Sequence, residues 1–154
     1  MKNTLLLFLV ITVKFNLNAQ WTNISFSGND FSVVVAKGDT MFVGGAAGIY
    51  KSINGNSYTD ISNGLRQWPS IQDIVIYGNK IFASITYDGV FVSEDNGATW
   101  KNFNNQLNYN GGVFKMCVSN GYLFVAAASR MYRTSFHQIN IKKRVEYLEK
   151  RHDF

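Results

Sequence analysis

Short apolar runs alternate with turn residues along most of the chain, and the runs come in three pairs. The first runs of the pairs cover residues 31–36, 71–77 and 113–119. The second runs are centred on Phe42, Phe82 and Phe124. The turn inside each pair contains Gly, and two of the three turns also contain Asn. Both residues accept the positive φ of a tight hairpin, so each pair predicts a β-hairpin.

Each hairpin is followed by a third apolar stretch that extends a repeating unit. These stretches carry Ile49-Tyr50, Val90-Phe91 and Met131-Tyr132, whose aromatic residues are evenly spaced. A fourth strand is predicted at Tyr58 and at Trp100. The period of about 41 residues, which holds four short strands, is the size of one propeller blade. The pattern predicts an all-β fold, a partial β-propeller of about three four-stranded blades over residues 20–136.

Trp21 precedes the first hairpin at about the distance that separates a fourth strand from the next unit. We therefore expect a lone fourth strand at Trp21, which brings the total to twelve strands and could complete the last blade. Propellers close with about four to eight blades, so three blades leave two alternatives. Either a homodimer completes a six-bladed ring, or the chain is an open arc that associates through exposed edges.

Composition agrees with one globular, β-rich domain. Hydrophobic residues make up 46% of the 154 residues and charged residues only 16%, and 13 Gly stand against a single Pro. These values exclude a disordered, collagen-like or strongly acidic chain. Cys117 is the single cysteine, so no intrachain disulfide is expected. It lies in an apolar run, where we expect a buried, unreactive thiol.

Residues 1–19 have the pattern of a secretory signal peptide. Lys2 precedes an apolar run over residues 5–13, and Ala19 marks the expected cleavage position. The run is about half of the ~20 residues needed to cross a bilayer, so no membrane span is expected. The pattern predicts a secreted, periplasmic or cell-surface protein. Removal of Lys2 and Lys14 lowers the net charge from +5 to +3, which leaves no support for a nucleic-acid partner.

Residues 93–100 carry the most specific motif in the chain. They read Ser-Glu-Asp-Asn-Gly-Ala-Thr-Trp and fit S-x-D-x-G-x-T-W at every fixed position. The motif resembles the Asp-box (BNR) repeat of sialidase-like propellers. The wider repeat, over residues 20–135, is similar to exported bacterial propellers of the sortilin and photosystem II assembly-factor type. The resemblance implies a structural role, on the face opposite any active site, for Ser93, Asp95, Gly97, Thr99 and Trp100.

The motif is degenerate in the other two repeats. The first repeat has Asn54 in the place of the Asp and Tyr58 in the place of the Trp, and the third repeat has lost the motif after Thr134. A calcium loop is not indicated, because position twelve counted from Asp95 is Gln106 and not a bidentate Glu. We therefore predict no metal and no cofactor.

Sialidases that resemble this repeat use an arginine triad, a Tyr–Glu nucleophile pair and an Asp acid. Between residues 20 and 136 this chain has three arginines, Arg66, Arg130 and Arg133, and its sole Glu is Glu94 inside the motif. Nothing here resembles the placement of the triad. We therefore predict no catalytic residue. A partial or degenerate sialidase-like glycoside hydrolase stays open as the alternative.

Two classes of propeller loop share the face where ligands usually bind. Loops from a fourth strand to the next unit carry Arg66, Trp68 and Tyr109, and loops from second to third strands carry Tyr87 and Asp88. Aromatic rings with polar neighbours suit a carbohydrate or a protein ligand. We predict an exported, non-enzymatic binding or assembly module. Two alternatives remain: Trp68 only packs the seam between blades, or the protein is an assembly factor resembling photosystem II stability-factor propellers and binds a protein partner.

Residues 137–154 differ in composition from the repeats. Ile141, Val145 and Leu148 form a stripe at helical spacing among Lys and Arg residues. This pattern predicts a basic amphipathic helix that covers an exposed sheet face or edge. A role at a membrane surface or on nucleic acid is the alternative, which three interspersed acidic residues disfavour.

Overall fold

The structure is a computed structural model. It describes residues 20–24, 30–105, 107, 109, 112–128 and 130–137. The predicted signal peptide and the predicted helix of the tail beyond residue 137 lie outside the described residues. Within the described part, no helix is long and apolar enough to cross a membrane.

The chain forms three antiparallel β-sheets, which confirms the prediction of an all-β fold. Sheet 1 consists of β1 (Phe31–Lys37), β2 (Thr40–Gly45), β3 (Gly48–Ile53) and β4 (Thr59–Asp60). Sheet 2 consists of β5 (Ile71–Tyr77), β6 (Lys80–Ile85), β7 (Gly89–Ser93) and β8 (Lys101–Asn102). Sheet 3 consists of β9 (Val113–Ser119), β10 (Tyr122–Ala127) and β11 (Arg130–Ser135). In every sheet, strands that are neighbours in sequence are neighbours in space.

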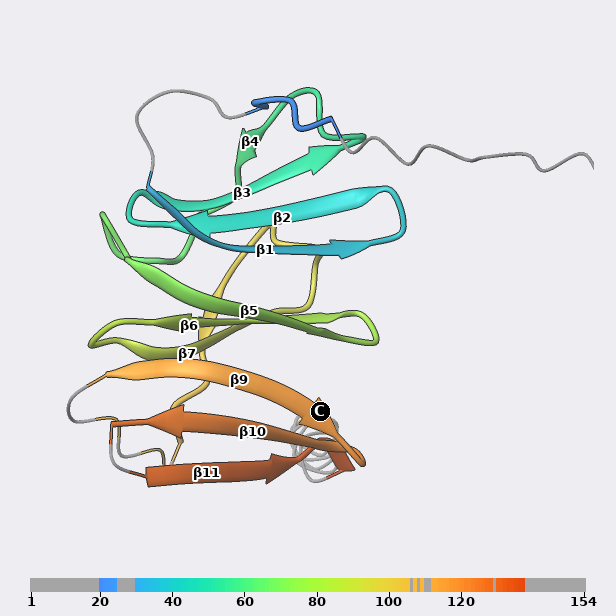
Figure 1. Cartoon of the computed structure of the whole chain (residues 1–154). Coiled ribbons are helices and arrows are strands. Elements are labelled where there is room, and N and C mark those ends of the chain that lie inside the picture. The colour runs from blue at the N-terminus through green and yellow to red at the C-terminus, as the bar shows by residue number, and fades with distance from the viewer. Residues whose placement is uncertain are drawn as a thin grey trace, which may run out of the picture.

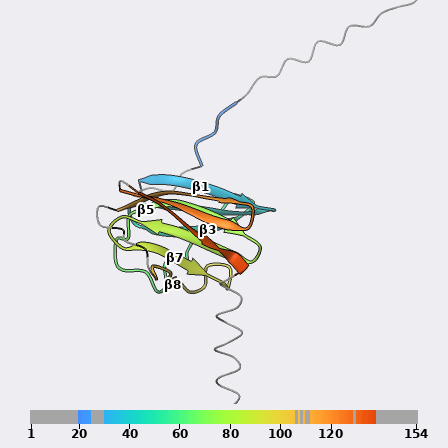
Figure 2. The same cartoon turned by 90° about the horizontal axis from the view of Figure 1, so that it is seen from below.

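The three sheets are stacked in the order of the sequence, with sheet 2 in the middle (Figure 1). Figure 2, seen from below, shows that the strands of the three sheets lie over one another. The first strands β1, β5 and β9 lie along one side of the stack and contact one another in turn. Among the described residues, the stack therefore buries both faces of sheet 2 but only one face of sheet 1 and one face of sheet 3.

The predicted repeat is present in the backbone register. Phe42, Phe82 and Phe124 stand opposite Val35, Val75 and Cys117 on the preceding strands. Each first strand also has a register irregularity near its beginning. One carbonyl just before each first strand accepts a hydrogen bond from the turn between the second and third strands. These pairs are Ala46 N to Asp30 O at 3.0 Å, Thr86 N to Ser70 O at 3.1 Å and Ala128 N to Gly112 O at 3.0 Å.

Two hydrophobic clusters hold the stack together. Between sheets 1 and 2 the buried residues are Phe42, Ile49, Ile71, Ile74, Ile81, Ala83, Ile85 and Trp100. Between sheets 2 and 3 they are Phe82, Val90, Val113, Met116, Leu123, Val125, Ala127 and Phe136. In both interfaces the face that carries the Phe of the second strand packs against the aliphatic face of the next sheet. Burial of the Val, Leu, Ile, Phe and Met side chains among these, about 1.5–3 kcal/mol each, is the main source of stability.

Two expectations from the sequence are wrong. Trp21 lies in the segment 20–24, which forms no strand, and it is 95% exposed. Among the described residues sheet 3 therefore has three strands, and the total is eleven rather than twelve. Cys117 is exposed and not buried. Alternation along β9 places Met116 in the core and Cys117 on the opposite face, and no described sheet covers that face.

Candidate functional site

Two loops at one end of sheet 2 are joined at two points. Arg66, in the loop between β4 and β5, forms an ion pair with Asp88, in the turn between β6 and β7, with Nε 2.5 Å from Oδ2. At the other end of the same loops, the carbonyl of Ser70 accepts a hydrogen bond from the amide of Thr86 at 3.1 Å. The segments 66–70 and 86–88 are thereby held against each other on both sides of their central residues.

The central residues of these segments are two exposed aromatics, Trp68 and Tyr87. Trp68 is 65% exposed and Tyr87 is 71% exposed. Both have a left-handed backbone, with φ of 55° and 66°. Such a conformation is rare for a bulky residue and costs about 1–3 kcal/mol, so it persists only where neighbouring contacts impose it. Two cross-links, the Arg66–Asp88 ion pair and the Ser70–Thr86 hydrogen bond, hold the backbone of both residues in place. Pro69, which follows Trp68, is buried and anchors the loop further.

The ion pair beside the aromatics is partly open to solvent, since the side chains of Arg66 and Asp88 are 48% and 26% exposed. An ion pair in that environment stabilises a fold by at most about 1 kcal/mol. Its effect is to fix the position of a guanidinium group, with five N–H donors, and of a carboxylate acceptor in the same two loops that carry the rings. The end of sheet 2 thus presents two apolar ring faces, a set of donors and an acceptor at the surface.

Four of the five predicted ligand-binding residues meet at this end, and the fifth does not join them. Tyr109 is half-buried and packs against the cluster between sheets 2 and 3. Its carbonyl accepts a hydrogen bond from the amide of Gly112 at 2.7 Å. Trp68 is 65% exposed, so the alternative that it only packs in the seam between blades is not favoured. We name Arg66, Trp68, Tyr87 and Asp88 the aromatic end.

The loop 93–100 is closed by side-chain hydrogen bonds. The Ser93 hydroxyl donates to Asp95 Oδ1 at 2.8 Å and accepts from the amide of Gly97 at 2.8 Å. Asp95 accepts from the amide of Thr99 at 2.9 Å and from the Thr99 hydroxyl at 2.5 Å. These bonds favour the ionised carboxylate, and those from Thr99, followed by that from Ser93, lower the pKa of Asp95 from 3.8 to about 2. Gly97 has the positive φ, 89°, that the turn requires.

Trp100 connects this loop to the preceding sheet. Its ring is 4% exposed in the cluster between sheets 1 and 2, and its Nε1 donates to the carbonyl of Ile61 at 2.7 Å. Its amide donates to the carbonyl of Asn63 at 3.0 Å. A Cβ on Gly97 would lie 2.4 Å from Cδ1 of Ile61, so the Ile61 side chain would have to move, and the φ of 89° also favours glycine there. The loop and its tryptophan therefore join two sheets.

The geometry offers little for catalysis or metal binding in the described residues. Glu94 forms an ion pair with Lys80, and Asp95 is occupied by its own loop. The guanidinium of Arg133 lies over the ring of Tyr122, 5.0 Å from its centroid, on sheet 3. Arg66, by contrast, is bound to Asp88 at the end of sheet 2. No group of three or more His, Cys, Asp or Glu side chains that could hold a metal occurs in the part of the chain that is described.

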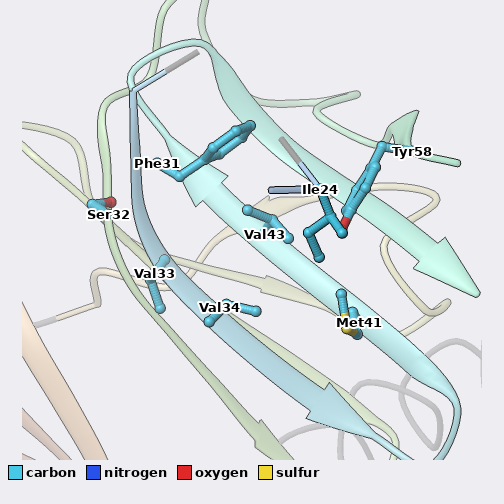
Figure 3. Close-up of a pocket in the computed structure, with 8 residues that line it drawn as sticks. All are labelled: Ile24, Phe31, Ser32, Val33, Val34, Met41, Val43 and Tyr58. Carbon is cyan, nitrogen blue, oxygen red and sulfur yellow. The ribbon is translucent and has the colours of Figure 1, made fainter. Parts of the chain in front are cut away.

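A second feature, which the sequence analysis did not identify, is an apolar groove on the outer face of sheet 1 (Figure 3). Its volume is about 390 Å³. The groove is lined by Ile24, Phe31, Ser32, Val33, Val34, Met41, Val43 and Tyr58. Period-two alternation of apolar residues along the first two strands was the available signal. This alternation indicates that one face of the two strands is apolar, but it does not indicate whether another sheet covers that face.

Comparisons with known proteins bear on the fold alone. No protein-family model matches the chain, and no curated protein matches it. Among solved structures, the fold is similar to the crystal structure of the computationally designed Ika4 protein, with a TM-score of 0.55 at 8% sequence identity. The match covers 69% of this chain and 66% of the designed chain, slightly less than two thirds of the latter.

Proposed function

We propose that the protein is a non-enzymatic binding module that recognises a carbohydrate through the aromatic end. The observation that carries the proposal is the pair of exposed rings, Trp68 and Tyr87, on strained backbone between two cross-links. Backbone strain held in place by surrounding contacts is typical of sites where a side chain must be pre-positioned. Exposed aromatic residues that serve only packing would not need such support.

Carbohydrate is the ligand class that suits this combination of groups. Sugar rings have apolar C–H faces that stack on Trp and Tyr, and hydroxyl groups at their edges that require donors and acceptors. Arg66 and Asp88 provide both kinds of group beside the rings. The predicted signal peptide would place the protein outside the cytoplasm, where glycans of cell surfaces are accessible.

For the architecture that carries this site, we propose a partial propeller in which each sheet is one blade. Three observations support it: the even spacing of the repeats, the stacking of each sheet on the next by the same faces, and the loop 93–100 with its Asp-box pattern. In this arrangement the loop 93–100 connects the second blade to the first. Of the aromatic end, Arg66 and Trp68 lie in the loop between the first and second blades, and Tyr87 and Asp88 lie in a turn within the second blade.

The test is a binding screen of the purified chain against immobilised glycans, including sialosides and glucan oligomers, followed by calorimetry on any ligand found. Trp68→Ala and Tyr87→Ala should each weaken binding by about tenfold or more, since an aromatic anchor contributes about 1.4 kcal/mol or more. Trp21→Ala removes an even more exposed tryptophan outside the site and should leave the affinity unchanged.

Three results would contradict the proposal. The first is the absence of saturable binding to any glycan, and the second is binding that Trp68→Ala leaves intact. The third is turnover of a bound glycan, because that result would favour a degenerate glycoside hydrolase over a binding module.

A further inference from the structure

The two interfaces inside the stack use the same pair of faces. The face of sheet 1 that carries Phe42 packs against the aliphatic face of sheet 2, and the face of sheet 2 that carries Phe82 packs against the aliphatic face of sheet 3. Two faces of the described sheets have no sheet against them. One is the aliphatic face of sheet 1, which holds the groove, and the other is the face of sheet 3 that carries Phe124.

Five of the eight residues that line the groove have counterparts in sheet 2 that are buried. Phe31, Val34, Met41, Val43 and Tyr58 correspond to Ile71, Ile74, Ile81, Ala83 and Trp100, one repeat further along the chain. All five counterparts belong to the cluster between sheets 1 and 2. Val34 is 65% exposed, whereas Ile74 is 3% exposed. The groove is therefore the surface that a further Phe-bearing sheet would cover (Figure 3).

The outer face of sheet 3, which carries Phe124, exposes residues whose counterparts in sheets 1 and 2 are packed between sheets. Met131 is 76% exposed, although its counterparts in sheets 1 and 2, Ile49 and Val90, are 0% and 1% exposed. Cys117 is exposed, whereas its counterparts Val35 and Val75 pack against the clusters between the sheets. The outer face of sheet 3 thus corresponds to the Phe42 face of sheet 1, which packs on sheet 2, and to the Phe82 face of sheet 2, which packs on sheet 3.

We infer that a second copy of this chain covers the groove. The Phe124 face of sheet 3 of one copy docks on the groove face of sheet 1 of the other, in the same manner as the sheets stack within one chain. Such a contact is head-to-tail, so each copy offers one face of each kind. The described part of each chain has three sheets, and a closure range of about four to eight blades then favours two copies and a ring of six sheets. The inference rests on the proposed propeller architecture, but it is separate from the proposed ligand site, because neither face includes the aromatic end.

The first test is the solution mass of the purified chain by light scattering coupled to size exclusion. A species with twice the mass of one chain is expected. Val34→Asp and Met131→Asp should each convert it to a monomer, because each replaces an exposed apolar side chain of the contact by a carboxylate that loses its water when the two faces meet. Ile53→Asp is the matched control: Ile53 is also an exposed aliphatic residue, at the end of β3, but it does not line the groove, and this variant should stay dimeric.

Mixing the two variants distinguishes a head-to-tail contact from a contact between like faces. In a mixture of Val34→Asp and Met131→Asp chains, one of the two junctions contains only unaltered faces, so a dimer should reappear. In a dimer that joins two groove faces, Met131→Asp would not dissociate it. That result would overturn the inference.

Cys117 provides a readout on the unaltered protein. In the ring its thiol lies in the contact, so its labelling by a thiol reagent should be slow at high protein concentration and should accelerate on dilution. The Val34→Asp variant should be labelled at the fast rate at all concentrations. A monomer in light scattering, a ladder of larger species, or labelling that does not depend on concentration would each overturn the two-copy ring.

Discussion

Trp100 offers the sharpest test of how the sheets are held together, because the chain has three tryptophans in three different environments. Trp100 is 4% exposed, Trp68 is 65% exposed and Trp21 is 95% exposed. Trp100→Ala removes the ring from the cluster between sheets 1 and 2, and large-to-small changes of a buried Trp cost about 3–5 kcal/mol. Against a total stability of about 5–15 kcal/mol, this loss is a large fraction.

A second substitution at the same position separates the hydrogen bond from the packing. Trp100→Phe keeps an aromatic ring but removes the N–H that donates to the carbonyl of Ile61 at 2.7 Å. We expect a loss of about 1–3 kcal/mol, the usual range for a buried acceptor left without its partner. The unfolding free energy of Trp100→Phe should therefore lie between that of the wild type and that of Trp100→Ala.

The assay is denaturant-induced unfolding followed by far-ultraviolet circular dichroism, which does not depend on the tryptophan that is removed. Trp21→Ala is the control of the same residue type and should change the unfolding free energy by no more than about 0.5 kcal/mol. If Trp100→Ala cost less than about 1 kcal/mol, or no more than Trp21→Ala, then the loop 93–100 would not join the two sheets as described.

Two other predictions concern hydrogen bonds within the repeats. The pKa of Asp95 is lowered from 3.8 to about 2, so its contribution to stability is present above about pH 4 and is lost as the pH falls through about 2. The difference in Tm between the wild type and Asp95→Asn should therefore shrink over that pH interval. A difference in Tm that does not change with pH would contradict the lowered pKa. Asn104→Ala removes the acceptor, 2.6 Å away, of the buried amide of Val90 and should cost about 1–3 kcal/mol in denaturant unfolding. Asn104→Ser should recover part of this loss, since the Ser62 hydroxyl accepts from the amide of Ile49 at 3.0 Å in the corresponding place of sheet 1; no recovery would argue against that equivalence.

Much of the fold follows from local features of the sequence. Alternation of apolar residues with Gly- and Asn-containing turns specifies each hairpin, because side-chain direction alternates along a strand and these residues accept the φ of a tight turn. The even spacing of the repeats also predicts that the sheets resemble one another. The candidate site was predictable in part, since Arg66, Trp68, Tyr87 and Asp88 were selected as loop residues on one face. Tyr109, selected by the same rule, is half-buried and packs against the cluster between sheets 2 and 3.

The amino-acid sequence alone predicts the three hairpins, the strand that follows each of them and the apolar side of these strands, whereas the lone strand expected at Trp21 does not form. Which of those sides are covered depends on the tertiary structure. Val34 and Cys117 have the same place in their strands as residues that are packed in sheet 2, yet both are exposed, because the alternation of a strand marks an apolar side without supplying the sheet that packs on it. The left-handed backbone of Trp68 was likewise beyond prediction, because it depends on contacts between two loops that are distant in sequence.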